Sequence, residues 1–228
     1  SKCESNSVDW WCCWFWQGAK EPNPAVGERS PVHQLFGRPI IVLLSPAGSP
    51  KGYFADFGWV AAPGANVALP GATTVWSTTA TTLTADKPAV LTWDNGQGLI
   101  FRRTISVDDN AMFAIKDEVD NKGSNPVSLL PYGVVTRFGK PPTLGFYVLH
   151  EGLIGVVDDG GLEEISYAHA VENPPAVFKS QHGWLGITDK YWAATLLPDT
   201  KANLQARFSY ASVGSLKTYQ SDYLLDAQ

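Results

Sequence analysis

The side chains best suited to acid–base chemistry in this sequence are its four histidines and its many carboxylates. A histidine acid and a carboxylate base can together open a sugar ring, and His150-Glu151 is the only place where the two types are adjacent. Neighbours on a β-strand point to opposite faces, so this pair cannot reach one substrate from a strand. The pattern therefore favours polar residues beside a turn. The other histidines (His33, His169, His182) lack a partner at a spacing that indicates chemistry.

Metal and cofactor motifs are equally weak. Asp108-Asp109-Asn110 and Asp158-Asp159-Gly160 resemble fragments of calcium loops, but the alternating ligands and the terminal bidentate glutamate are missing, which favours turns. Cys3, Cys12 and Cys13 form neither a disulfide framework nor a zinc spacing. No glycine-rich phosphate loop or nucleophile elbow is present in the sequence. We therefore predict no catalytic residue, no cofactor and no metal.

Aromatic residues are the remaining candidates for a binding site. Aromatic faces bury a large area at low entropic cost, so they can hold an extended peptide or an apolar ligand in a cleft. The alternative is a role in the core, which the pattern favours for Trp184 and Trp192. For Tyr191 the pattern favours neither the cleft nor the core. The candidate cleft residues are Phe146, Tyr147, Trp184, Tyr191 and Trp192.

Composition bounds the class of protein. The chain has 228 residues, of which 44% are hydrophobic and 17% charged, so it can bury a core and fold as one large domain. Its net charge is −5, and the basic residues are scattered rather than clustered. Nucleic acids and anionic lipid surfaces attract clustered positive charge, so neither is expected as a partner.

Short strands dominate the pattern from residue 40 onward. Apolar or alternating stretches are interrupted about every eight to twelve residues by Gly, Pro, Asn or Asp, which is typical of antiparallel sheets. The Asn95-Gly96 turn between two such stretches is a strong hairpin signal. We expect about twelve strands and almost no helix. Among them are 89–93, 99–107, 112–119, 127–130, 144–150, 153–157, 183–188, 191–197 and 206–210.

The first 39 residues have a different character. Residues 1–19 form a leader rich in tryptophan and cysteine, and we interpret it either as an interfacial membrane anchor or as a frameshifted or cloning-derived remnant. Residues 20–39 are interpreted as a linker or as degenerate first strands. Residues 40–228 then form the β-sandwich domain.

Several blocks of the sequence match a known family. They are Leu44 to Gly48, Tyr53 to Val60 (YFADFGWV), Leu91 to Phe101, Pro131 to Gly133, Leu144 to Gly152, and Gly183 to Pro198 (GWLGITDKYWAATLLP). In these blocks the chain resembles the periplasmic domain of the YidC (YidC/Oxa1/Alb3) membrane protein insertases, alphaproteobacterial type.

The resemblance implies an all-β fold, a twisted β-supersandwich of antiparallel strands like that of galactose mutarotase. It also implies a periplasmic position at the bacterial inner membrane and a non-catalytic role in the insertion and folding of inner-membrane proteins. The implied partners are Sec translocon accessory subunits and nascent membrane proteins, with membrane contact only through transmembrane segments that this sequence does not contain. Two alternatives remain open, namely a mutarotase-like carbohydrate-active enzyme or sugar-binding module, and a purely structural spacer.

Overall fold

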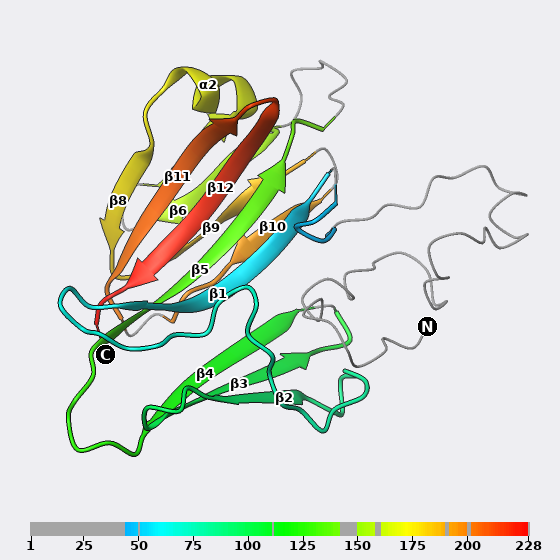
Figure 1. Ribbon diagram of the computed structural model, residues 1–228. Coiled ribbons are helices and arrows are strands. Elements are labelled where there is room, and N and C mark those ends of the chain that lie inside the picture. Colours follow the sequence, from blue (N-terminus) through cyan, green and yellow to red (C-terminus); the bar gives the residue numbers. More distant parts are fainter. Residues whose placement is uncertain are drawn as a thin grey trace, which may run out of the picture. The chain divides into compact units, whose positions relative to one another are not determined.

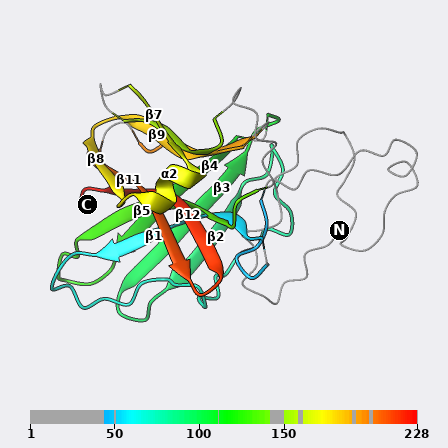
Figure 2. The same ribbon diagram turned by 90° about the horizontal axis from the view of Figure 1, so that it is seen from above.

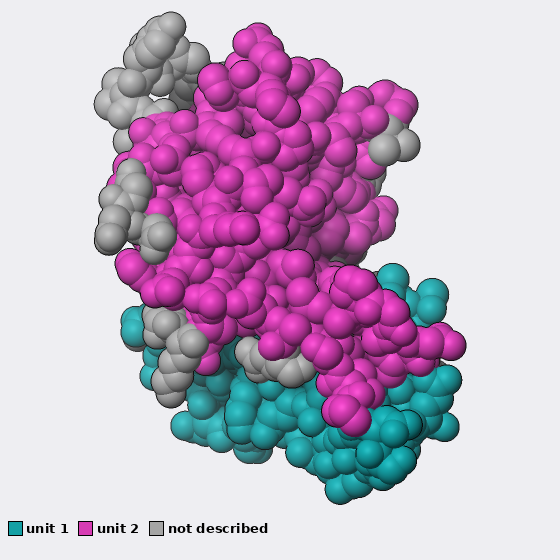
Figure 3. Space-filling view, turned by 90° about the vertical axis from the view of Figure 1, so that its left-hand side faces the viewer, with its two compact units in different colours: residues 1–44, 72–125 teal, residues 45–71, 126–228 magenta. Residues whose placement is uncertain are grey.

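The computed structural model describes residues 44–49, 51–110, 112–141, 150–157, 161–189, 192–199 and 202–227. These ranges contain twelve strands and one short helix, which confirms the predicted all-β class. The chain separates into two compact units: unit 1 is residues 1–44 and 72–125, and unit 2 is residues 45–71 and 126–228 (Figure 3). The leader and linker lie outside the described residues, and the division at residues 19 and 39 stays a prediction.

Unit 1 contains a three-stranded antiparallel sheet in the order β2 (Ala89–Asp94), β3 (Leu99–Val107), β4 (Phe113–Asn121). The predicted hairpin is confirmed, because β2 pairs with β3 around residues 95–98. The Asn95 side chain accepts hydrogen bonds from the backbone N–H groups of Gln97 and Leu99, at 2.8 and 3.0 Å, which stabilises the turn. Alternate β3 residues are buried, with Phe101 at 0% and Arg103 at 1% exposure.

Unit 2 contains a five-stranded antiparallel sheet (Figure 1). Its strands, in spatial order, are β1 (Tyr53–Ala61), β5 (Leu129–Phe138), β12 (Leu216–Leu225), β11 (Leu204–Val213) and β8 (Ala176–Ser180). The sequence underestimates this sheet: β5 continues well past the predicted end at residue 130, through Pro131, and β12 is a central strand at a place where no strand is predicted.

A second antiparallel sheet, of four strands, completes unit 2. Its order is β10 (Ala193–Leu196), β9 (Gly183–Thr188), β6 (Gly152–Val157), β7 (Leu162–Ser166). The short helix α2 (Tyr167–Glu172) connects β7 to β8. Ser166 caps its N-terminus by accepting from the N–H of His169 at 3.2 Å. The predicted strand 144–150 lies outside the described residues except for His150, which precedes β6.

The two sheets of unit 2 face each other as a sandwich (Figure 2). Direct hydrogen bonds join them: Ser221 Oγ of β12 donates to the carbonyl of Gly186 at 2.6 Å, and Tyr53 Oη of β1 donates to the carbonyl of Ile187 at 3.1 Å. Apolar side chains fill the space between, with exposures of 0 to 2%; they include Leu153, Leu185, Ile187, Val135 and Phe208. The β-sandwich is therefore confirmed, and the closer relation to galactose mutarotase stays a prediction.

Candidate functional site

The structure describes two of the five aromatic residues predicted to line a cleft. Phe146, Tyr147 and Tyr191 lie outside the described residues. Trp184 is the second residue of β9, where it pairs with Val156 of β6.

Trp192 lies beyond the other end of that strand, because its carbonyl accepts from the N–H of Asp189 at 2.8 Å. About five residues of extended chain, or roughly 17 Å, therefore separate Trp184 from Trp192 along β9. The structure does not bring these two residues together, and the cleft stays a prediction.

The position of Trp184 corrects the interpretation of this residue as core. Leu185 and Ile187 point into the sandwich, with 1% and 0% exposure. Side chains alternate along a strand, so Trp184 lies on the outer face, where it is half-buried. Trp192 is also half-buried, and its indole Nε1 is a buried atom with no hydrogen-bond partner among the described residues.

The polar residues weighed as catalytic or metal-binding have structural roles where they are described. His150 and Glu151 precede β6, and the His150 ring nitrogen Nε2 lies 2.9 Å from the carbonyl of Leu153. Asp108 is a turn residue, since its Oδ1 accepts from the N–H groups of Asn110 and Met112, both at 2.8 Å. Within the described residues no group of three or more potential metal ligands occurs, and no helix is long and apolar enough to cross a membrane.

A buried polar cluster, which the sequence did not predict, lies between the sheets of unit 2. Arg137 of β5 forms an ion pair with Asp189, the residue after β9, and its guanidinium lies 4.6 Å from the ring centroid of Tyr53. The Tyr167 hydroxyl of α2 donates to Asp189 Oδ1 at 2.9 Å. We call Tyr53, Arg137, Tyr167, Asp189 and Tyr219 the Asp189 cluster.

Strand register explains how distant residues meet in the Asp189 cluster. Tyr53, Arg137 and Tyr219 are direct cross-strand partners on β1, β5 and β12, so their side chains share the inner face. The ring of Tyr167 packs edge-on against Tyr219, with 4.7 Å between centroids. The cluster thus ties both sheets and α2 together. Its guanidinium and carboxylate pair with each other, and the Tyr53 and Tyr167 hydroxyls donate to Ile187 and Asp189, so the arrangement supports a structural role rather than a catalytic one.

We expect the free energy of unfolding to fall at alkaline pH. Burial, and then the negative charge of Asp189, raise the pKa of the Tyr53 and Tyr167 hydroxyls above the ordinary value of 10.0. Above about pH 10 these tyrosines lose their protons in the unfolded chain but keep them in the folded protein. The stability that their raised pKa values contribute is therefore fully present below about pH 10 and is lost as the pH rises further. Urea midpoints measured from about pH 8 to pH 11 test this. A Tyr167→Phe variant should show a shallower decline; an unchanged decline would contradict the explanation.

Comparisons with known proteins give one consistent result. The family model described as the YidC periplasmic domain matches residues 34–228. Proteins named "Membrane protein insertase YidC" are similar to the chain. That of Bradyrhizobium diazoefficiens is 56% identical over 189 residues, which cover 82% of this chain and 30% of the relative. Those of Nitrobacter hamburgensis and Rhizobium etli are 54% and 48% identical, each covering 83% of this chain and 31% of the relative.

The chain therefore spans about 30% of the length of these relatives. The matched range contains all twelve described strands and the sequence blocks that carry the predicted resemblance. That resemblance, including its alphaproteobacterial type, is confirmed. The chain belongs to the YidC periplasmic domain family.

Proposed function

We propose that this domain assists the insertion and folding of inner-membrane proteins through protein–protein contacts, without chemistry of its own. The observation that carries the proposal is the family match over residues 34–228, together with the relatives described above, which are named membrane protein insertases. The family description also agrees with the predicted location, on the periplasmic side of the bacterial inner membrane. The domain would act as one part of an insertase.

The partners follow from the same assignment. Nascent membrane proteins are the substrates of an insertase, so their periplasmic segments are the first candidates for contact. Sec translocon accessory subunits are the second, as the sequence resemblance implies. The net charge of −5 and the scattered basic residues favour protein partners over nucleic acids and anionic lipids.

The rival function, a mutarotase-like enzyme or sugar-binding module, has weaker support. The His150 ring contacts its own backbone near the start of β6, not a facing carboxylate. A hollow beside α2, lined by residues that include His169, Ala170 and Tyr210, holds only about 60 Å³. Pockets that hold drug-sized ligands are about 300–1,000 Å³ in volume. A role in insertion also agrees better with the names of the relatives.

Photo-crosslinking in a full-length insertase tests the proposal. Residues 34–228 replace the periplasmic domain of the Bradyrhizobium diazoefficiens relative, with a photoreactive amino acid at Thr195, Lys179 or Lys116 in turn. These exposed positions lie on β10, β8 and β4. We expect crosslinks from at least one position to newly made membrane proteins or to a Sec accessory subunit. A well-expressed hybrid without any crosslink would favour the structural spacer, and accelerated mutarotation of α-glucose by the domain would favour the enzyme.

A further inference from the structure

The outer face of the four-stranded sheet carries a continuous apolar row. Val156 of β6 pairs with Leu162 of β7 on one side and with Trp184 of β9 on the other, so the three side chains share a face. Leu197 directly follows Leu196, the last residue of β10, which pairs with Leu185, the neighbour of Trp184 on β9. We call Leu162, Val156, Trp184 and Leu197 the outer row.

The outer row is accessible. Leu162 and Leu197 are 55% and 62% exposed, while Val156 and Trp184 are half-buried. Gly186 follows Trp184 on the same face and has no side chain, which leaves one side of the indole uncovered by its strand neighbour. A tryptophan flanked by exposed leucines is the kind of anchor found at the centre of protein interfaces.

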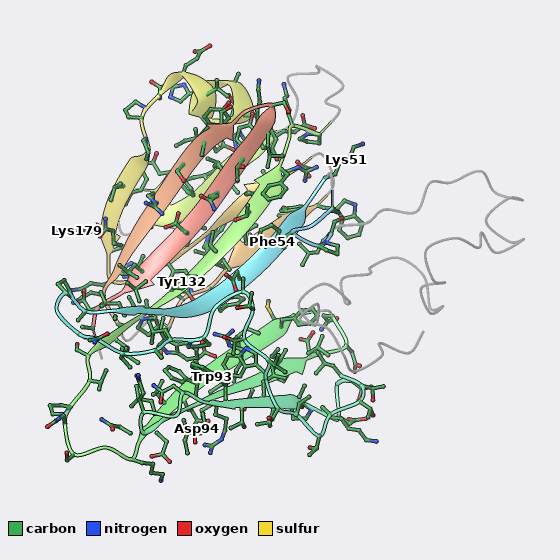
Figure 4. The ribbon with its side chains drawn as sticks, in the orientation of Figure 1. Lys51, Phe54, Trp93, Asp94, Tyr132 and Lys179 are labelled. Atoms are coloured by element: carbon green, nitrogen blue, oxygen red, sulfur yellow. The ribbon has the colours of Figure 1, made fainter. Side chains whose placement is uncertain are left out.

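The outer face of the other sheet differs, because several of its polar side chains are paired with one another. Arg207 bonds to Asp222 at 3.0 Å, Gln220 donates to Thr136 at 3.1 Å, and Tyr132 donates to Asp56 at 3.3 Å. Figure 4 shows Phe54, Tyr132 and Lys179 along this sheet. Here the Phe54 ring packs edge-on against Phe138, 5.7 Å between centroids. These groups are occupied within the domain, unlike the outer row.

Charge indicates the chemistry of the partner. Glu164 of β7 lies on the outer face, where it pairs across to Ile154 and is exposed. It forms no salt bridge within the described part of the chain, and β6, β7, β9 and β10 contain no lysine or arginine. A single exposed carboxylate among uncharged strand residues favours a basic side chain over an anionic lipid headgroup.

We propose that the outer row docks an apolar protein segment that carries a basic residue, with Trp184 and the two leucines holding the apolar part and Glu164 pairing with the basic group. The inference rests on the proposed function, because it specifies the chemistry of the segment that the domain contacts. A membrane surface or a second copy of the chain are the other occupants that the experiment must separate.

Fluorescence anisotropy of the full chain provides the test. The probe is a short labelled peptide of alternating leucine and alanine with a lysine at each end, and the matched peptide has glutamate in place of lysine. We expect saturable binding of the lysine peptide and clearly weaker binding of the glutamate peptide. Trp184→Ala and Leu197→Ser should each weaken binding by about tenfold or more. Glu164→Gln should weaken it less and reduce its dependence on salt.

Val177→Ser is the matched control, since Val177 is 50% exposed on β8 of the other sheet. It should leave binding unchanged, and urea midpoints of all variants show that they fold. The proposal would be overturned if both peptides bound with equal affinity, or if neither bound. It would also be overturned if Val177→Ser weakened binding as much as Trp184→Ala does. Tighter binding to vesicles of phosphatidylcholine and phosphatidylglycerol in equal parts would overturn it too, as would a dimer in sedimentation that Trp184→Ala dissociates. None of these results would bear on the crosslinks expected of the proposed function at Lys179 and Lys116, which lie on other sheets.

Discussion

Asp189→Ala should lower the free energy of unfolding by about 3 kcal/mol, because it leaves a largely buried guanidinium and a buried hydroxyl without their acceptor. Arg137 and Asp189 are only 17% and 19% exposed, so water cannot fully replace the lost carboxylate. The Tyr167 hydroxyl loses the same partner. Tyr167 is 2% exposed. The effect should appear as a lower urea midpoint at an unchanged slope.

Two further variants separate the charge of Asp189 from its hydrogen bond. Asp189→Asn keeps an oxygen that accepts from Tyr167 while removing the negative charge, so it should cost less than the alanine variant. Lys122→Ala is the control for an ion pair at the surface, since Lys122 and Asp120 are 63% and 43% exposed, and it should cost at most about 1 kcal/mol. If Asp189→Ala were no worse than Lys122→Ala, the Asp189 cluster would not hold the sheets together.

Local patterns were sufficient to predict much of the fold. The strands at 99–107 and 183–188 were predicted with the bounds that the structure shows, because alternating side chains and turn residues are both visible in a short window. The Asn95-Gly96 hairpin follows from the turn alone. These features depend on residues that are neighbours in the chain.

Features that depend on distant residues were missed. β12 mixes polar and aromatic residues (LKTYQSDYLL), so only its position between β5 and β11 explains why Tyr219 and Ser221 are buried. The Asp189 cluster gathers side chains from β1, β5, β12, α2 and the end of β9, and no spacing in the sequence connects them. The outward position of Trp184 was missed for a related reason. Alternation shows that neighbouring side chains point to opposite faces of the strand, but it does not show which face packs into the sandwich.

Arg103 and Asp117 form the ion pair with the largest expected effect in unit 1. Arg103 Nε and Nη2 bond to the two carboxylate oxygens of Asp117 at 2.5 and 2.6 Å, between directly paired positions of β3 and β4. The guanidinium also lies 5.7 Å from the ring centroid of Trp76. Arg103 is 1% and Asp117 17% exposed, so this two-bond pair compensates a positive charge that water does not reach.

Asp117→Ala should therefore destabilise unit 1 by about 3–5 kcal/mol, the cost of removing the carboxylate that pairs with a buried charge. Glu118→Ala is the matched control, because the adjacent Glu118 pairs with Lys116 at 3.0 Å on the exposed side of the same strand and should contribute no more than about 1 kcal/mol. Hydrogen exchange of peptides from 89–121 reports on this unit directly, and only Asp117→Ala should accelerate it strongly. Replacing both Arg103 and Asp117 by apolar residues should restore part of the lost stability, since no buried charge remains. Equal protection in the Asp117→Ala and Glu118→Ala variants would mean that the Arg103 charge is compensated by other groups, and that β3 and β4 do not depend on this pair.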